Sequence, residues 1–232
     1  NLLTISGMTV GKSAGGIATN TAIGKSALSS NTTGARNTAV GDRALSVNTS
    51  GKDNTAVGHL ALQDITTGIY NTGSGSYALA NTTTGNYNTA TGTASLYKNT
   101  TADQNTASGF NSLRLNTTGC YNSAHGSQSL RSNTTGSFNV ANGMYALYSN
   151  STSHHNTASG YNALVCTTSG YNTAIASGAL QNNSTGTLGS ALGYRSLFTN
   201  TTGAQNSAFG GYALYANTTA SKNTASGYKA LT

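Results

Sequence analysis

Proline, tryptophan and glutamate are absent from this chain of 232 residues, and charged residues make up only 6% of it. The side-chain carboxylates are therefore four aspartates, too scattered to predict a catalytic carboxylate pair. No apolar run reaches membrane-spanning length, and residues 1–16 lack the basic start and long apolar core of a signal peptide. We expect no membrane insertion of this segment. Because the chain begins without Met and stops within a repeat, we expect it to be an internal piece of a longer protein.

The two cysteines and the scattered cations exclude two further classes. Cys120 and Cys166 fall three repeats apart, too far for a disulfide if the repeats stack about 4.8 Å apart. The net charge of +7 comes from 11 Lys and Arg that occur singly between Lys12 and Lys229. A nucleic-acid binder would cluster them, so we expect no nucleic-acid partner. A mild attraction to anionic surface polymers is all that this charge supports.

One 17-residue unit, N-T-A-x-G-x-x-A-L-x-x-N-T-T-G-x-x, fills nearly the whole chain. Residues 1–19 are a degenerate N-terminal segment, and residues 20–232 form a repeat array of twelve complete copies and a truncated thirteenth. A fixed short period predicts a solenoid, in which each unit buries its apolar face against its neighbours. The copy that begins at Asn156 is shorter than the others by a single residue, and we expect a shortened corner there with the stack of Leu164 on Leu180 kept in line. The copies begin at residues 20, 37, 54, 71, 88, 105, 122, 139, 156, 172, 189, 206 and 223.

The register of the repeat predicts an all-β fold with one coil per unit. Glycine at position 5, with β-branched Thr and Asn nearby, disfavours helix and favours short strands at about positions 2–4 and 7–10. Asn at positions 1 and 12 should form amide ladders at the corners. Position 8 is always Ala or Ser, and position 9 is Leu in every copy. The leucines are Leu28, Leu45, Leu62, Leu79, Leu96, Leu113, Leu130, Leu147, Leu164, Leu180, Leu197, Leu214 and Leu231.

The apolar content of one coil is small, which predicts association between chains. One buried Leu contributes roughly 1.5–3 kcal/mol, whereas fixing each residue's backbone costs about 1–2 kcal/mol. If positions 7–10 are a strand, positions 8 and 9 face opposite sides, and both sides should be covered. We therefore expect a homotrimer. Position 4 is apolar near both ends of the array and polar between them, so we expect it to point to the coil interior or to a shared axis.

The steps Asn20–Gly24, Asn37–Gly41 and Gly189–Gly193 resemble those of a known family. They are similar to the N-S-x-A-I-G step in the heads of trimeric autotransporter adhesins, and to the N-T-A-x-G-x-x-A-L arrays of trimeric phage-type tail fibres. The resemblance covers residues 20–232. It implies a left-handed parallel β-roll, three chains about one axis, and a role in attachment to a surface. The period here is longer than that of the adhesin heads, and position 4 turns polar in mid-chain.

Titratable residues give no catalytic, cofactor or metal site. Asp42, Asp53, Asp64 and Asp103 occupy different repeat positions, and solvated surface carboxylates are the simpler interpretation. No Ser-His-Asp arrangement or G-x-S-x-G elbow occurs. We therefore expect no enzyme. Three copies of His125 about a threefold axis could hold an ion, and the other histidines, His59, His154 and His155, lie in variable positions.

The 13 tyrosines leave two interpretations open. All of them fall at repeat positions 6, 7, 10 and 17. They could be aromatic platforms for glycans or a protein receptor, or they could pack between subunits with the hydroxyl at the rim. Packing is the preferred interpretation because the core is thin. The residues are Tyr70, Tyr77, Tyr87, Tyr97, Tyr121, Tyr145, Tyr148, Tyr161, Tyr171, Tyr194, Tyr212, Tyr215 and Tyr228.

Two functions follow from these patterns. The first is a structural and adhesive segment of an extracellular trimeric fibre, on a cell surface or a virion tail, that binds an unidentified receptor such as a glycan or another surface polymer. The second is an ice-binding solenoid, since stacked Thr columns make a regular array. The Thr columns at positions 2, 13 and 14 are interrupted by Ser50, Ser123, Val140 and Ser151, which favours the fibre.

Overall fold

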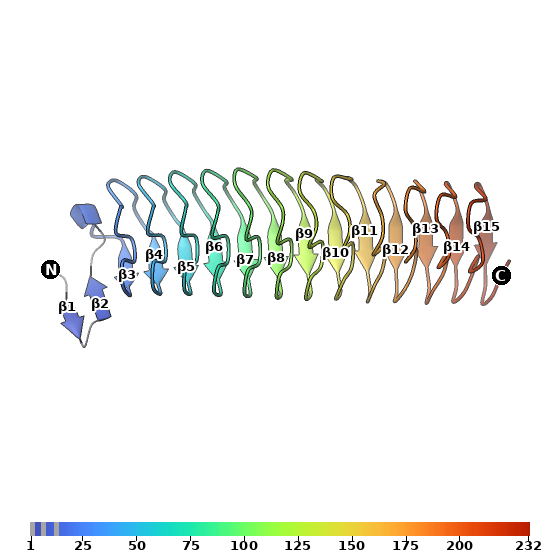
Figure 1. The fold of residues 1–232 in the computed structure, drawn as a ribbon, viewed down its shortest axis with the longest axis horizontal. Coiled ribbons are helices and arrows are strands. Elements are labelled where there is room, and N and C mark those ends of the chain that lie inside the picture. Colours follow the sequence, from blue (N-terminus) through green and yellow to red (C-terminus); the bar gives the residue numbers. More distant parts are fainter. Residues whose placement is uncertain (1–2, 6–7, 12–13) are drawn as a thin grey trace. The chain divides into compact units, whose positions relative to one another are not determined.

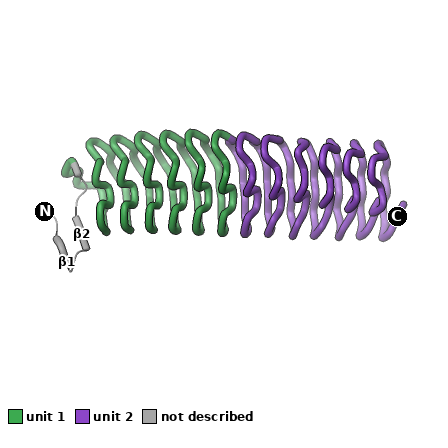
Figure 2. Tube along the Cα trace, in the orientation of Figure 1, with its two compact units in different colours: residues 1–118 green, residues 119–232 purple. Residues whose placement is uncertain are grey.

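The computed structural model describes residues 3–5, 8–11 and 14–232. It divides into two compact units, residues 1–118 and residues 119–232 (Figure 2). Both units are built from short strands joined by turns (Figure 1), with a single turn of 3₁₀ helix at Ala14–Gly16. Among the described residues, no helix is long and apolar enough to cross a membrane.

The first unit begins with an antiparallel pair and continues as a parallel sheet. Strands β1 (Leu3–Ile5) and β2 (Met8–Gly11) pair antiparallel, and β2 pairs antiparallel with β3. From β3 onward each strand pairs in parallel with the next one along the chain. These strands are β3 (Thr21–Ile23), β4 (Thr38–Val40), β5 (Thr55–Val57), β6 (Thr72–Ser74), β7 (Thr89–Thr91) and β8 (Thr106–Ser108).

The second unit repeats the parallel arrangement with seven strands. Each pairs in register with the strand that follows it. Since partner residues occupy the same position of successive repeats, one repeat is one coil, and the predicted parallel β-solenoid is confirmed. The strands are β9 (Ser123–His125), β10 (Val140–Asn142), β11 (Thr157–Ser159), β12 (Thr173–Ile175), β13 (Ser190–Leu192), β14 (Ser207–Phe209) and β15 (Thr224–Ser226).

Each strand covers repeat positions 2–4 and turns position 3 inward. Ala39 and Ala191 are fully buried at this position. A methyl group is all that fits, because a Cβ built on Gly73 would already lie 3.4 Å from the Leu62 side chain. Side chains alternate along a strand, so positions 2 and 4 both lie on its outer face. We call the columns at positions 2 and 4 the sheet face.

The expectation that position 4 points into the coil is wrong. Ile175 is 42% exposed, Leu192 36% and Phe209 42%. Position 3 occupies the narrow interior, and the two-residue period of the strand leaves position 4 no inward direction. An inward role for position 4 would therefore require other chains against the sheet face.

The predicted second strand at positions 7–10 is also wrong. The extended backbone ends at position 4, and positions 7 and 9 adopt the left-handed backbone region, as in Arg43 (φ 54°) and Leu45 (φ 53°). The amide of Arg43 donates back to Lys25 of the preceding coil, whereas that of Leu45 donates forward to Ala61. These alternating turns place Ala44 and Leu45 in the same interior, both fully buried.

This turn removes one argument for a trimer and completes the core within one chain. Positions 8 and 9 do not face opposite sides, so their constancy does not require a second covering chain. Twelve of the thirteen position-9 leucines are at most 4% exposed. The exception is Leu231 in the thirteenth repeat, which is 66% exposed.

Asn ladders tie the corners, as predicted. Asn54 donates its backbone N–H to Oδ1 of Asn37 (3.0 Å), and Nδ2 of Asn37 donates to the carbonyl of Gly51 (2.8 Å). At position 12, Nδ2 of Asn48 donates to Oδ1 of Asn31 (2.8 Å). These side chains are at most 1% exposed. Asn31 and Asn48 each begin an N-x-T/S motif, and their burial makes them inaccessible to N-glycosylation in the folded state.

Close approach between coils requires glycine at Gly58, at position 5, and at Gly51, at position 15. Gly58 has φ 137°, and a Cβ there would lie 2.6 Å from the carbonyl oxygen of Gly75. A Cβ on Gly51 would lie 2.5 Å from the carbonyl oxygen of Gly68. Both sites therefore exclude larger side chains for steric reasons, and position 5 does so for conformational reasons as well.

The short copy that begins at Asn156 loses its residue at position 14. The amide of Leu164 donates to the carbonyl of Ala179, which lies one residue fewer along the chain than the acceptor in the full-length copies. Leu164 and Leu180 both remain fully buried. The corner closes differently here, because the amide of Ser169 donates to Oγ1 of Thr167 (3.2 Å). Oγ of Ser169 then donates to the carbonyl of Gly186 (2.6 Å). The prediction of a shortened corner with the leucine column kept in line is confirmed.

Candidate functional site

The aspartates have local partners rather than one another. Arg36 binds both carboxylate oxygens of Asp53, at 2.6 and 2.7 Å. These hydrogen bonds hold the pKa of Asp53 below its usual value of 3.8. Burial raises the pKa of Asp64 above that value. Asp42 lies 3.7 Å from His59, and Asp103 accepts from the amide of Asn86. The contacts of these residues are structural.

Histidines and cysteines are likewise dispersed. Within the described residues, no three His, Cys or Asp side chains are grouped as metal ligands. His125 lies on the sheet face, where its ring is within 3.2 Å of Oγ of Ser123. The trimer-axis ion site proposed for it stays a prediction. Cys120 and Cys166 are not joined by a disulfide, as expected from their separation.

The first unit carries an aromatic and cationic cluster at positions 7, 10 and 11. Tyr77 and Tyr97 meet edge to face, with ring centroids 6.1 Å apart. The guanidinium of Arg114 lies 5.3 Å from the ring centroid of Tyr97, and the ammonium of Lys98 lies 5.5 Å from it. Tyr77, Ala94, Tyr97 and Arg114 line a pocket of about 280 Å³. We call these four residues, with Lys98, the Tyr97 cluster.

The Tyr97 cluster follows from the stacking of coils. Tyr97 and Arg114 both occupy position 10 in successive repeats, so one lies directly over the other. Position 7 of the coil that carries Tyr97 is Ala94, whose small side chain leaves open the space beside Tyr77. The guanidinium of Arg114 lies close enough to this ring for a cation–π contact.

The second unit repeats the contact of a cation with a ring at three places, the last of them between the ammonium of Lys229 and the ring of Tyr228 (5.4 Å). Arg131 lies 5.6 Å from the ring of Tyr148 and donates to its hydroxyl (3.2 Å). Arg195 lies 5.3 Å from Tyr194 and 5.1 Å from Phe198. Further rings extend the second place, where burial raises the pKa of Tyr212 above its usual 10.0 and the neighbouring Tyr194 adds to the shift. Sequence columns alone did not predict these pairings, although the shared position 10 in successive repeats could have indicated the contact of Arg131 with Tyr148.

Position 17 forms a separate stack of rings in the second unit. Tyr121, Phe138, His155 and Tyr171 stack in order with centroids 4.9–5.0 Å apart and nearly parallel planes. Each ring covers the face of the next, so the outer edges are what solvent reaches. This stack is better suited to holding coils in line than to receiving a ligand between rings.

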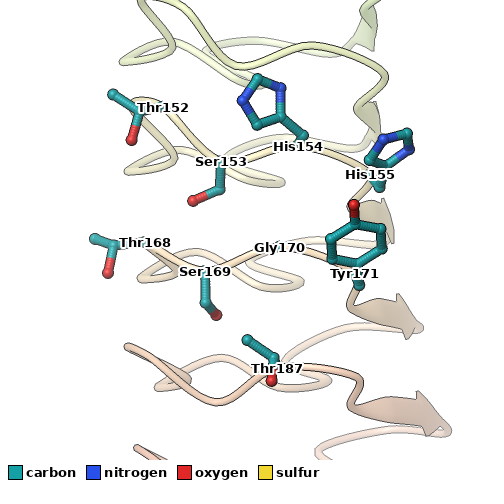
Figure 3. Close-up of a pocket in the computed structure, with 9 residues that line it drawn as sticks. All are labelled: Thr152, Ser153, His154, His155, Thr168, Ser169, Gly170, Tyr171 and Thr187. Atoms are coloured by element: carbon teal, nitrogen blue, oxygen red, sulfur yellow. The ribbon is translucent and has the colours of Figure 1, made fainter.

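The shortened corner leaves a notch of about 460 Å³ in the second unit. Figure 3 shows His155 and Tyr171 on one side of it and Thr152 and Thr168 on the other. Position 16 is Gly170 here, so the column lacks a side chain at this point. Nδ1 of His154 accepts from the amide of Ser137 in the preceding coil. The notch is lined by hydroxyls and rings without Lys, Arg or Asp, and it has the character of a packing irregularity.

No protein-family model, no curated protein and no solved structure matches this chain. The function of the site therefore follows from its own geometry.

Proposed function

We propose that this chain is a structural and adhesive segment of an extracellular fibre in which three copies pack through their sheet faces. The observation that carries the proposal is an exposed apolar row on adjacent strands. Ile175 pairs in register with Leu192, and Leu192 with Phe209. All three are at least 36% exposed in the single chain. Ile23, Val40 and Val57 form a corresponding row in the first unit.

The composition of the sheet face suits packing against a second copy. Positions 2 and 4 contain no Lys, Arg or Asp in any repeat, although the chain carries a net charge of +7. Two copies can therefore approach through this face without repulsion between like charges. Small Thr and Ser at position 2 beside the apolar groups allow close contact. The number three rests on the resemblance to trimeric adhesin heads and tail fibres.

A repetitive surface without a grouped set of catalytic residues supports a role in attachment to another surface. The Tyr97 cluster and its counterparts lie outside the sheet face, at positions 6, 7, 10 and 11. They would stay accessible when the sheet faces are covered. We propose an extracellular location on a cell surface or virion tail, with the receptor bound through these rings.

Sedimentation of the chain tests the assembly. We expect an elongated species of three times the chain mass of 23.3 kDa. Leu192→Asp should dissociate it, because a carboxylate would be buried in each interface. Ser127→Asp is the matched control, since it introduces the same charge at a partly exposed position 6, outside the sheet face. A folded wild-type monomer, or equal effects of the two variants, would contradict the proposal.

The unbroken Thr column of the first unit favours a second candidate, ice binding. Position 2 is Thr in all six of its parallel repeat strands, β3 to β8, at the regular spacing of a parallel sheet. The Thr hydroxyls at position 13 are already used, as in Thr49, whose Oγ1 donates to the carbonyl of Thr66. The neighbouring column at position 4 is irregular. A thermal-hysteresis measurement decides between the two candidates. If it shows a clear gap between the melting and freezing points, and Thr72→Lys abolishes this gap, ice binding replaces the fibre proposal.

A further inference from the structure

We infer that the Tyr97 cluster is a binding site for an anionic sugar, one residue of an acidic surface polysaccharide. This inference rests on the proposed attachment role and names the ligand class of that surface. The pocket between Tyr77, Ala94, Tyr97 and Arg114 has the chemistry that such a sugar requires. A sugar ring presents C–H groups on its faces, hydroxyls at its rim and, in acidic sugars, a carboxylate or sulfate.

The size and walls of the pocket fit a single ring. Its volume of about 280 Å³ lies at the lower end of ligand pockets. Tyr77 and Tyr97 stand at 74° to each other, so they offer one ring face and one ring edge to the same space. Tyr77 is 38% exposed, which leaves its ring open to solvent from the pocket side. Aromatic rings give large contact areas with little loss of side-chain entropy.

The charge of the cluster requires an anion. Lys98 and Arg114 both approach the ring of Tyr97, and the described residues provide no carboxylate in contact with either cation. The first-unit pair Arg36–Asp53 shows the contrast, since that guanidinium is satisfied bidentately. The guanidinium of Arg114 carries N–H groups in a fork that can donate two hydrogen bonds to a carboxylate or sulfate.

Asp64 does not neutralise this site. Asp64 occupies position 11, two coils before Lys98 in the same column, or roughly 10 Å away at the spacing of parallel strands. His59 contacts the far side of Tyr77, with ring centroids 5.2 Å apart. The cluster therefore presents two positive charges and two phenol rings to solvent.

The repetition of ring-and-cation pairs in the second unit indicates a polymeric ligand. Arg131 with Tyr148 and Arg195 with Tyr194 and Phe198 lie four coils apart, about 19 Å at the usual strand spacing. A chain that carries an anion on successive residues can occupy more than one such place, and linked weak sites gain affinity through effective concentration. A single small anion would gain nothing from the repetition.

Calorimetric titration of the chain with tetragalacturonate tests the site, with a sulfated heparin tetrasaccharide as a second probe and maltotetraose as the neutral control. We expect binding to at least one acidic probe, weaker at high salt, and at least tenfold weaker for maltotetraose. Which acidic probe binds more tightly decides between a carboxylate and a sulfate as the natural anion.

Matched variants separate the site from general charge attraction. Arg114→Gln should weaken binding at least tenfold, whereas Arg43→Gln, an exposed arginine at position 7 without a ring contact among the described residues, should change it less than twofold. Tyr97→Leu should weaken binding, and Tyr87→Leu, in the position-17 stack of the same unit, should leave it unchanged. Circular dichroism shows that each variant is folded.

Three results would overturn the inference: equal losses for Arg114→Gln and Arg43→Gln, equal binding of the neutral probe, or equally tight binding of a single-stranded oligonucleotide. Sedimentation of the Arg114→Gln variant measures its oligomeric state, so that the test of the sugar site is separate from the test of the proposed fibre. A trimer without sugar binding would reject the site alone, and a monomer that binds the acidic probe would reject the assembly alone.

Discussion

At the scale of single residues, the unusual feature is leucine in the left-handed backbone region. Leu96 has φ 49° and Leu113 has φ 51°, a conformation that costs a non-glycine residue about 1–2 kcal/mol. Full burial of a leucine side chain contributes roughly 1.5–3 kcal/mol, enough to offset that cost. The same left-handed step directs the small position-8 residue into the core beside it.

The core position should not tolerate a charge, whereas position 6 should. Leu113→Asp places an unpaired carboxylate at a fully buried site and should lower the free energy of unfolding by at least about 3 kcal/mol. Ser127→Asp, at a partly exposed position 6, should change it by less than about 0.5 kcal/mol. Thermal melts of both variants check this, and equal melting temperatures would contradict the assignment of inside and outside.

Glycine should stabilise the fold at a position in the left-handed backbone region, whereas it should destabilise the fold at a position within a strand. Ala94→Gly relieves the strain at φ 54° and should raise the free energy of unfolding by up to about 1 kcal/mol. Ala90→Gly, in strand β7 and fully buried, should lower it by roughly 1 kcal/mol. Denaturant titration measures both. A loss of stability for Ala94→Gly comparable to that for Ala90→Gly would show that position 7 is not strained.

Asp64 should destabilise the fold near neutral pH. Burial raises its pKa, so the folded state favours the protonated form, and stability is gained as pH falls through the folded-state pKa. Asp64→Asn should therefore raise the melting temperature at pH 7 and leave it unchanged at pH 3, where wild-type Asp64 is already protonated. A variant that is less stable than wild type at pH 7 would reverse this account.

At the scale of elements, the position-12 ladder breaks wherever Asn is replaced. Oδ1 of Asn48 and Oδ1 of Asn150 are buried without a hydrogen-bond partner. In each case the next coil supplies a different residue at position 12, Ile65 or Thr167. Buried unpaired acceptors cost free energy, so the two breaks are local weak points of the corner.

Restoring the ladder should stabilise the shortened corner. Thr167→Asn supplies an Nδ2 donor to Asn150 and should raise the free energy of unfolding by about 1 kcal/mol. Thr82→Asn is the control, because the preceding residue of its column is Ile65, which offers no acceptor, and it should bring no gain. Amide exchange at Asn150 and Thr167 locates the change. A destabilised Thr167→Asn would show that the short corner requires the Thr167–Ser169 hydrogen bond.

At the scale of the whole molecule, stability should depend little on pH. The chain has four carboxylates, and the two with shifted pKa values act in opposite directions. Asp53 contributes stability above pH 3.8 that is lost as pH falls, whereas Asp64 contributes stability that is gained. Melting temperatures at pH 3 to 7 should therefore be nearly constant. A steep acid transition would indicate carboxylates with stronger partners, such as those of a neighbouring chain.

The sequence alone determined that one repeat forms one coil, and it determined the leucine column, the Asn ladders and the shortened corner between Asn156 and Tyr171. Each of these features depends on identical residues stacking upon themselves. Which side chains face inward at positions 4 and 8 was decided only by the tertiary structure. Leucine has no local preference for φ near 50°, and it adopts this conformation because neighbouring coils bury it and bind its amide. The contact of Arg114 with Tyr97 likewise exists only once the coils are stacked, since a full repeat separates the two in the chain.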